Sequence, residues 1–446
     1  MGDAWGTWPI VRPVAAWRPW LLAAIYAGAL LPLTYLPRHS GNVFSRYMAI
    51  EAMVERGELA VERSPLLIPS GTPDLVMFGP HLYSDKPPVL PAIAAPLYAV
   101  LYGCGLRFAG RGNAFVWANL AMTWGVAGLI SACGVAWARR LFQAVPIAPW
   151  VSDLLALALG FGTQMLTYAV TFNNHSVGAA ALIGAFAFAV LEPAGEARHR
   201  ARFGSGLLAG LAATVDLPAG CWMLAGLGLI QAIRVRSVPW AFLLGALGPL
   251  ALHCVLQSRV TGTPLPAEMY PEAFNYPGSY WATPEGTWKE RGPRGWFALE
   301  LLVGPQGWLT VTPVLVVGLV GVAAAMARRG DPMRPAAWLV GSSAVVLVAY
   351  YTWGVRRLDF AGASFGTRHL LAISPLVYVF AVVAASRLRA WWAVALMAPL
   401  LAVGFVYAYA GMKDPWSRIE KREATEPALR ALQRFTPYRP SGDRRP

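Results

Sequence analysis

Long stretches almost without charge limit the folds that are open to this chain. Several of them run for about 17–25 residues, the length that a helix needs to cross the hydrocarbon core of a bilayer. Of the 446 residues, 56% are hydrophobic and 13% are charged, whereas a soluble domain carries about a quarter charged residues. This pattern excludes a soluble globular domain, a disordered chain and a coiled coil. It predicts an all-α integral membrane protein.

The apolar stretches predict about eleven membrane-spanning helices in a transmembrane domain over residues 1–410. A polar tail over residues 411–446 follows them. Segment 88–104 is also apolar, but counting it as a span would move every later loop to the other side. We therefore expect it to lie in the outer interface or to re-enter it. The predicted spans are 19–36, 113–137, 150–170, 175–191, 204–216, 217–233, 239–257, 308–326, 336–352, 369–386 and 390–410.

Arginine clusters in the short connections predict the orientation in the membrane. With the spans above, they all fall on the side of the N-terminus, and Arg-rich short loops are typical of the cytoplasmic side. The tail then ends outside. The Ala-, Gly- and Arg-rich composition favours a bacterial source, and hence the inner (plasma) membrane. The clusters are Arg139 and Arg140; Arg198, Arg200 and Arg202; Arg234 and Arg236; Arg328, Arg329 and Arg334; and Arg387 and Arg389.

The net charge of +14 would suggest a nucleic-acid partner in a soluble protein. Here topology and anionic lipid explain it better, so we expect no nucleic acid. The four cysteines lie in or beside apolar segments without a CxxC motif and are interpreted as packing residues. Neither GxGxxG after a strand nor GKS/T occurs, which argues against a soluble nucleotide-sugar or ATP site.

The predicted topology places all long loops on the outer face: 37–112, 259–306 and 353–368. A transporter usually has short connections and two related halves, and this sequence shows no internal repeat. Large loops on one side favour a chemical site at the outer membrane surface.

An amphipathic helix is predicted over Ser45–Gly57, with Ser45 as N-cap and Gly57 as the stop. Arg46 then lies at the positive end of the helix dipole, where a cation is disfavoured. A residue that breaks a local rule is often functional, but an arginine that reaches lipid phosphate is an equal alternative. Glu51 lies on the polar face.

The densest chemistry in the first loop is Asp74 and the run His81–Pro88, which contains Tyr83, Asp85 and Lys86. Asp85 can accept a proton or hold a divalent cation, and Lys86 can hold a phosphate. The alternative is a surface ion pair that caps the following helix, worth about 0–1 kcal/mol.

Two later outer turns add candidate ligands. Asn174 and His175 lie between two predicted spans and suit recognition of hydroxyl or phosphate groups, although Asn also suits turns. Arg368 and His369 end a glycine-containing stretch at the membrane surface, where a planar guanidinium matches phosphate oxygens. Asp216, between two short spans, is a functional candidate because it is ionisable and lies within the membrane. It can equally cap the following helix, and we favour that structural role.

Several of these motifs resemble those of the GT-C membrane glycosyltransferases. They are the Arg46-Tyr47 helix followed by Gly57, the Asp85-Lys86-Pro87 run, and the Gly-x-Ser-x-Gly-x-Arg-His stretch that ends at His369. The likeness is closest to the protein O-mannosyltransferase and aminoarabinose-transferase branch, including its bacterial members. It implies a sugar taken from a polyprenyl-phosphate donor at the outer face and passed to a lipid, glycan or protein acceptor.

The resemblance also implies a catalytic carboxylate just before the Arg-Tyr pair. This sequence has Asn42-Val43-Phe44-Ser45 there. Asp85 and Asp74 are therefore the predicted bases, with Glu51 third.

The resemblance implies that Lys86, Arg368, Arg46 and His369 bind the donor phosphate. Asn174, His175, Glu51 and Tyr83 are the predicted substrate contacts. Direct displacement would invert the anomeric centre.

No metal-ligand cluster is evident in the sequence, so no metal site is predicted. A divalent cation, Mg²⁺ or Mn²⁺, between Asp85 and phosphate remains an alternative. The rival functions are a transporter of lipid or lipid-linked saccharide and a non-catalytic family member.

Overall fold

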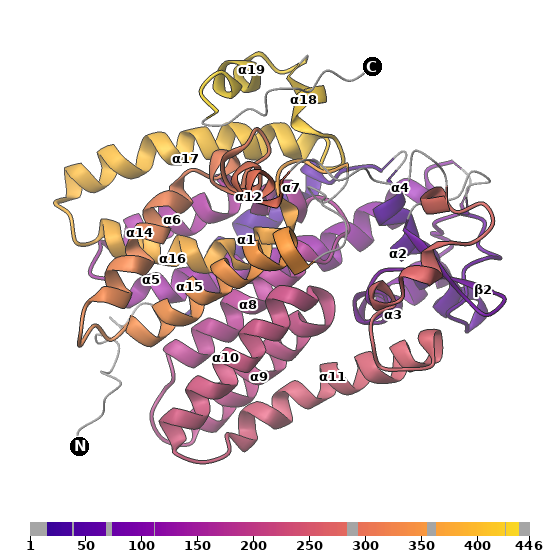
Figure 1. Cartoon of the computed structure of the whole chain (residues 1–446), viewed down its shortest axis with the longest axis horizontal. Helices are drawn as coiled ribbons and strands as arrows, with labels where there is room; N and C mark the ends of the chain where they lie inside the picture. The colour runs from indigo at the N-terminus through magenta and orange to yellow at the C-terminus, as the bar shows by residue number, and fades with distance from the viewer. Residues whose placement is uncertain are drawn as a thin grey trace.

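The computed structural model describes residues 16–37, 40–67, 74–110, 112–282, 293–354, 363–423 and 425–436. These residues form a mostly helical bundle with one small hairpin (Figure 1). The helices are α1 (Arg18–Leu30), α2 (Gly41–Glu51), α3 (Val89–Gly103), α4 (Ala114–Met122), α5 (Leu129–Gln143), α6 (Pro149–Phe161), α7 (Gln164–Ala169), α8 (His175–Val190), α9 (Ala197–Val215), α10 (Leu217–Val235), α11 (Trp240–Thr261), α12 (Arg294–Val303), α13 (Trp308–Val311), α14 (Val314–Ala327), α15 (Arg334–Ala349), α16 (Ser374–Ala385), α17 (Ala390–Lys413), α18 (Ile419–Arg422) and α19 (Pro427–Gln433).

Among the described residues, six helices are long and apolar enough to cross a membrane. A bent pair, Arg294–Val311 with Val314–Ala327, raises this to as many as seven. The protein is thus a multi-pass membrane protein. The six are Ala114–Gln143, Leu217–Val235, Trp240–Thr261, Arg334–Gly354, Arg368–Ala385 and Ala390–Lys413.

The predicted count of eleven spans is not confirmed. Several predicted spans are apolar helices too short to pass as full spans, including α1, α6 and α8. The predicted span 308–326 breaks by 101° between α13 and α14. Thr312 leaves the helical region there, and Pro313, which follows it, has no backbone N–H to continue the hydrogen-bond ladder.

Helix α8 lies at the centre of the bundle between α5 and α9. It is apolar all round and almost wholly buried, as expected of a helix surrounded by others. Small residues permit its close contacts, as in many membrane helix pairs. A Cβ on Gly134 of α5, for example, would lie 3.1 Å from the Cβ of Ala180.

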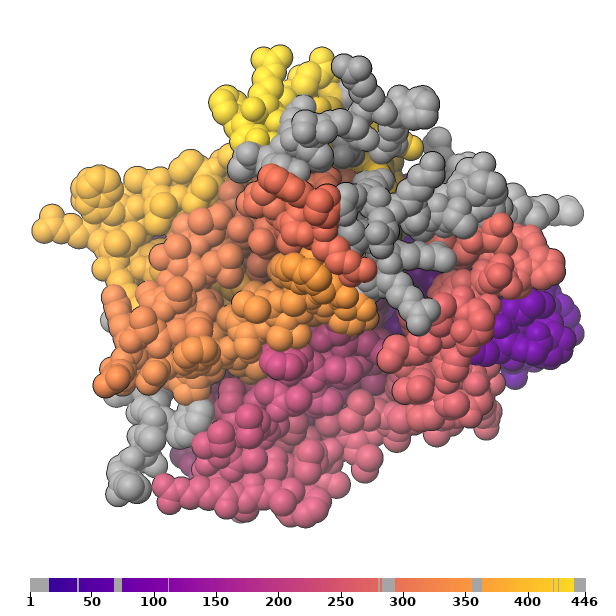
Figure 2. All heavy atoms as spheres, viewed as in Figure 1, coloured from indigo at the N-terminus to yellow at the C-terminus, as the bar shows by residue number. Residues whose placement is uncertain are grey.

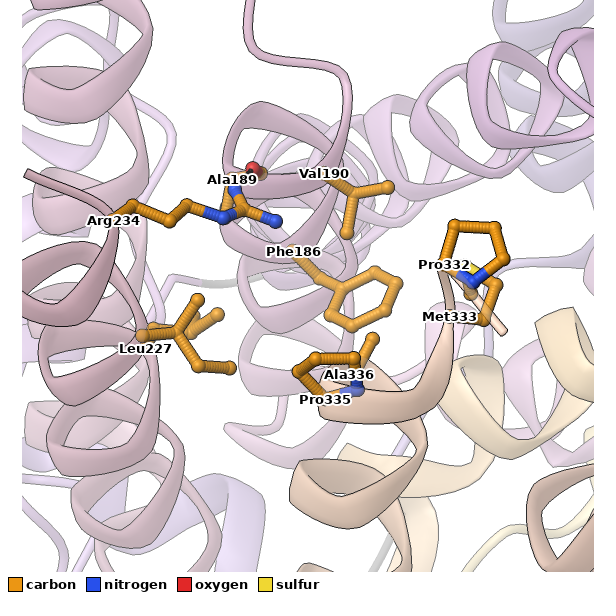
Figure 3. Close-up of a pocket in the computed structure, with 10 residues that line it drawn as sticks. Phe186, Ala189, Val190, Leu227, Arg234, Pro332, Met333, Pro335 and Ala336 are labelled. Carbon is orange, nitrogen blue, oxygen red and sulfur yellow. Dashed lines mark hydrogen bonds between the residues drawn. The ribbon is translucent and has the colours of Figure 1, made fainter. Parts of the chain in front are cut away.

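The arginine-rich turns gather at one end of the bundle. Arg234 at the end of α10 donates to the carbonyl of Ala189 at the end of α8, and both line a small cavity with Pro332 beside α15 (Figure 3). In the next turn Asp331 pairs with Arg387 at 2.7 Å. Because α8 ends there, its first residue, His175, lies at the opposite end of the bundle. Asn174, just before it, accepts a hydrogen bond from Arg46 of the first loop.

The N-cap of α2 is Ser40, whose Oγ accepts from the Val43 N–H, so the prediction of Ser45 as N-cap is wrong. Arg46 consequently lies in the second turn rather than at the positive end of the helix. The predicted stop at Gly57 is confirmed, with φ of 70° after a π-helical turn over Ala52–Arg56.

A two-stranded antiparallel sheet follows, which departs from the predicted all-α content. Strands β1 (Leu75–Phe78) and β2 (His81–Ser84) pair Leu75 with Ser84 and Phe78 with His81. The tight turn uses Gly79 at φ of 58°. Val76 packs against Ala267 and Ala273 after α11, and Figure 2 shows that segment lying against the first loop.

The residues after α17 form part of the packed structure. Helix α17 continues beyond the predicted boundary at residue 410 to Lys413. Ile419 and Leu429 of the tail are fully buried against Phe365 and Tyr407. The segment predicted as a polar tail therefore contributes an apolar face to the same end of the bundle as the first loop.

Candidate functional site

Arg46 is a buried arginine that joins the first loop to the bundle. Its side chain is 1% exposed. Nη1 donates to the carbonyl of Asn42 at 2.7 Å and to the side-chain oxygen of Asn42, and Nη2 donates to Oδ1 of Asn174. Asn174 in turn donates to the carbonyl of Val215 at 2.8 Å. Burial, followed by the charge of Arg368, lowers the pKa of Arg46 to about 10, so the guanidinium stays charged at neutral pH.

The hairpin brings Asp74 and Asp85 together, since one residue precedes β1 and the other follows β2. The Asp85 N–H donates to the carbonyl of Asp74 at 3.3 Å. Lys86 Nζ lies between the two carboxylates, 2.6 Å from Oδ1 of Asp74 and 3.0 Å from Oδ2 of Asp85. Ser45 of α2 holds this end of the hairpin, with its Oγ donating to the carbonyl of Asp74 at 2.6 Å.

The two carboxylates differ in their protonation. Burial raises the pKa of Asp85 to about 6, because the charge of Lys86 only partly compensates for lost solvation and Asp74 adds repulsion. Burial also opposes ionisation of Asp74, but the charge and hydrogen bond of Lys86 outweigh it and lower that pKa. Oδ1 of Asp85 is buried without a hydrogen-bond partner among the described residues. Asp85 is thus the carboxylate that is free to exchange a proton near neutral pH.

Arg368 supplies a third cation. It begins the 3₁₀ turn Arg368–Ile373, and its guanidinium carbon lies 5.1 Å from the ring centre of Trp416. Its Nε is buried without a hydrogen-bond partner in the described part of the chain. Arg368 and Arg46 are close enough to interact electrostatically with each other and with Asp74.

An aspartate–histidine pair completes the site. Nδ1 of His175 lies 2.9 Å from Oδ2 of Asp216. Asp216 stands at the N-cap position of α10, as predicted, but its side chain makes no capping bond and pairs with His175 instead. The His175 ring centre lies 5.7 Å from that of His369, which stacks on Tyr351 at 4.4 Å.

We call this group the polar cluster. It combines three cations, three carboxylates and two imidazoles from five separate parts of the chain. Its members are Arg46, Asp74, Asp85, Lys86, His175, Asp216, Arg368 and His369.

Two predicted site residues lie outside the cluster. Glu51 pairs with Arg56 instead. Tyr83 packs with Val76 and Phe78 against the residues after α11. Glu51 ends α2, the helix that carries Arg46, and Tyr83 lies in β2 two residues before Asp85. Their side chains nevertheless point away from the polar cluster.

Sequence reasoning did not identify three residues that interact with the polar cluster: Glu268 with Asp85, Tyr351 with His369, and Trp416 with Arg368. Glu268 keeps contact with solvent, yet the surrounding protein and then the charge of Asp85 raise its pKa. Nothing in the local sequence marks these three residues. For Asp216 a signal existed, since an ionisable residue between apolar segments is a functional candidate.

The described residues contain no group of three or more His, Cys, Asp or Glu side chains placed to hold a metal ion. Asp85 directs one oxygen at Lys86, and a cation would need additional oxygen ligands. As they stand, these residues do not fit the divalent cation that the sequence left as an alternative, and we derive no step through one.

No known family profile matches the chain, and no curated protein does. Solved structures do. The Archaeoglobus fulgidus oligosaccharyltransferase, in complex with Zn and sulfate, aligns over 95% of this chain with a TM-score of 0.50 and 13% identity. The chain has a GT-C fold. It spans 58% of the length of that oligosaccharyltransferase.

Two further GT-C structures are similar. ArnT from Cupriavidus metallidurans in the apo state aligns over 90% of this chain and 76% of its own, with 16% identity and a TM-score of 0.49. The same protein bound to undecaprenyl phosphate aligns over 89% and 75%, with 15% identity and a TM-score of 0.49. The alignment with the oligosaccharyltransferase confirms the fold that the motif resemblance implied, while the site chemistry of this chain has to be argued from its own side chains.

Proposed function

We propose that this protein is a membrane glycosyltransferase that moves a sugar from a polyprenyl-phosphate donor to an acceptor hydroxyl. The observation that carries this proposal is the convergence of Arg46, Lys86 and Arg368 around the pair Asp74 and Asp85. One buried oxygen of Asp85 has no hydrogen-bond partner among the described residues. Three cations suit a phosphate, and a carboxylate with a pKa of about 6 suits a general base. The GT-C fold, shared with an oligosaccharyltransferase, supports the same class of reaction.

The reaction would be a single displacement at the anomeric carbon. Asp85 takes the proton of the acceptor hydroxyl as its oxygen attacks that carbon. The bond from the carbon to the phosphate oxygen breaks, and the polyprenyl phosphate leaves with the electron pair. Arg46, Lys86 and Arg368 stabilise the charge that grows on the departing phosphate. Attack from the face opposite the leaving group inverts the anomeric centre.

Asp85 is a better base than Asp74 because their partners differ. Asp74 lies 2.6 Å from Lys86 and its pKa is lowered, so it remains an ionised partner of that lysine. Its role in this proposal is to hold Lys86 in place. Asn174, His175 and His369 lie on the bundle side of the cluster and would contact the donor sugar or its phosphate.

The position of the arginine-rich turns supports a proposal for the location of the site in the cell. The arginine-rich turns lie at the end of the bundle opposite to the polar cluster. If those turns face the cytoplasm, the site opens at the outer face of a bacterial inner membrane, where a polyprenyl-phosphate sugar can enter from the bilayer.

The test uses purified protein in liposomes with labelled polyprenyl-phosphate hexoses and pentoses, and it follows the release of free polyprenyl phosphate. We expect turnover by the wild type, a loss of about 10²–10⁴-fold in Asp85→Asn, and a smaller loss in Asp74→Asn. Asp331→Asn, at the opposite end of the bundle, is the matched control and should retain turnover. Passage of intact lipid-linked sugar without cleavage would instead establish a transporter, and neither activity would indicate a non-catalytic family member.

A further inference from the structure

Trp416 lies outside every motif used above, yet it contacts the polar cluster directly. The guanidinium of Arg368 lies 5.1 Å from its ring centre, a distance at which a cation is attracted to an aromatic face. Arg368 has a buried Nε without a hydrogen-bond partner among the described residues. A cation–π contact uses none of the hydrogen-bond donors of a guanidinium, so its N–H groups stay available to an anion.

The indole of Trp416 is itself held on several sides. Its Nε1 donates to Oγ1 of Thr171 at 3.0 Å, and its backbone N–H donates to Oδ1 of Asp414 at 3.3 Å. Its ring meets that of Tyr168 edge-on, with centres 6.3 Å apart. Tyr168 belongs to α7 and Thr171 to the turn between α7 and α8, so the indole is held by the residues that immediately precede His175.

The backbone on either side of the contact is joined as well. The N–H of Phe365 donates to the carbonyl of Pro415 at 3.0 Å, which ties the segment before Arg368 to the residue before Trp416. Farther along, Gln433 donates to the carbonyl of Pro305 at 2.9 Å and Leu429 is fully buried. The tail is therefore anchored beyond Trp416 too.

We propose that Trp416 is a positioning residue that holds the Arg368 guanidinium, whose Nε has no hydrogen-bond partner among the described residues, toward the phosphate of a polyprenyl-phosphate lipid. This inference rests on the proposed function for the identity of the ligand. It assigns to the C-terminal segment after α17 a part in ligand binding that the sequence did not indicate, through the contact of Trp416 with Arg368.

The test is a double-mutant cycle on the full chain in nanodiscs, with radiolabelled undecaprenyl phosphate as the probe and undecaprenol as the comparison without phosphate. We expect Trp416→Leu to weaken binding of the phosphate lipid about three- to tenfold. Arg368→Ala should weaken it about 10–100-fold, because it removes charged hydrogen bonds. The double variant should bind no more weakly than Arg368→Ala alone. Trp416→Phe, which keeps a ring, should stay within about twofold of the wild type.

A second measurement does not depend on the ligand. In lipid-free protein, phenylglyoxal should modify Arg368 several-fold faster in Trp416→Leu than in the wild type, while its rate at Arg46 stays unchanged. Thr171→Val, which only frees the indole N–H, should shift the rate at Arg368 in the same direction and serves if Trp416→Leu does not fold. Trp338→Leu, an exposed tryptophan of α15, is the control and should change neither measurement.

The outcomes separate the two ideas. Additive losses in the cycle, or unchanged labelling of Arg368, would overturn the positioning role of Trp416. A wild-type protein that binds undecaprenyl phosphate no better than undecaprenol would overturn the proposed function and the phosphate half of this inference. Faster labelling of Arg368 would in that case still establish the contact with Trp416.

Discussion

His175 Nδ1 lies 2.9 Å from Oδ2 of Asp216, a carboxylate 41 residues farther along the chain. Asp216 occupies the break between α9 and α10, and His175 is the first residue of α8. Gly178 makes the approach possible, because a Cβ at that position would lie 2.9 Å from the Cβ of Asp216. The partner of Nδ1 determines which ring nitrogen carries the proton, so Asp216 controls what Nε2 of His175 can accept or donate.

Asp216→Asn should therefore impair substrate binding without unfolding the protein. The amide has the same shape but can donate to Nδ1, which would move the imidazole proton to Nε2. Losing one directed hydrogen bond to the substrate costs about 1–2 kcal/mol, so we expect the KM to rise about tenfold with a smaller change in kcat. Steady-state kinetics would check this. A KM change of the same size in Asp331→Asn, which lies at the other end of the bundle, would argue against a local effect.

The rate of sugar transfer should fall in acid with a midpoint near pH 6. Burial raises the pKa of Asp85 from its ordinary value of 3.8 to about 6, so its carboxylate is ionised above that pH and neutral below it. A base must be unprotonated to accept a proton, and kcat/KM should drop as the pH falls through about 6. A pH profile of donor cleavage measures this. A profile that stays flat down to the ordinary pKa of an aspartate would exclude Asp85 as the base.

Tyr47→Phe should lower stability and leave the polar cluster unchanged. The Tyr47 hydroxyl is fully buried and donates to Oδ1 of Asn119 at 2.8 Å. Removing it leaves that amide oxygen without this donor, at a cost of about 1–3 kcal/mol. Thermal unfolding in detergent would show a lower Tm. Tyr409→Phe, at an exposed residue of α17, should leave the Tm unchanged.

Gly206→Ala should disrupt the contact between α9 and α11. A Cβ at Gly206 would lie 1.9 Å from the carbonyl oxygen of Phe242, so the helices would have to separate. Overpacking of this kind costs about 1–3 kcal/mol. We expect a lower Tm and a smaller folded yield in detergent. Gly28→Ala in α1 meets no atom within 4 Å and should match the wild type or exceed it slightly. Equal Tm values for the two variants would contradict this account of the helix contact.

The membrane class and the main chemical groups could be predicted from the sequence. Transfer of apolar side chains from water into lipid is close to additive along a segment, so composition and length reveal helices such as α11 and α17 without knowledge of their neighbours. Asp85 and Lys86 are covalent neighbours, and Arg368 ends a recognisable motif. Such local patterns can be recognised without the fold, and eight of the ten predicted site residues lie in or contact the polar cluster.

The remainder was decided by packing. Two predicted site residues, Glu51 and Tyr83, carry suitable chemistry but lie on faces that α2 and β2 turn away from the cluster. Asp74 is brought beside Asp85 only because β1 and β2 pair, and that register depends on cross-strand contacts.

The longest-range contacts of the site depend on tertiary structure most of all. Asp216 reaches His175, and Trp416 reaches Arg368, only when α8, α9 and the segment after α17 are packed together. The sequence by itself determined that this chain enters a membrane and which charged groups it carries. The tertiary structure alone decided which of those groups meet, because contacts between distant segments depend on the shapes and packing of whole helices, which no local pattern encodes.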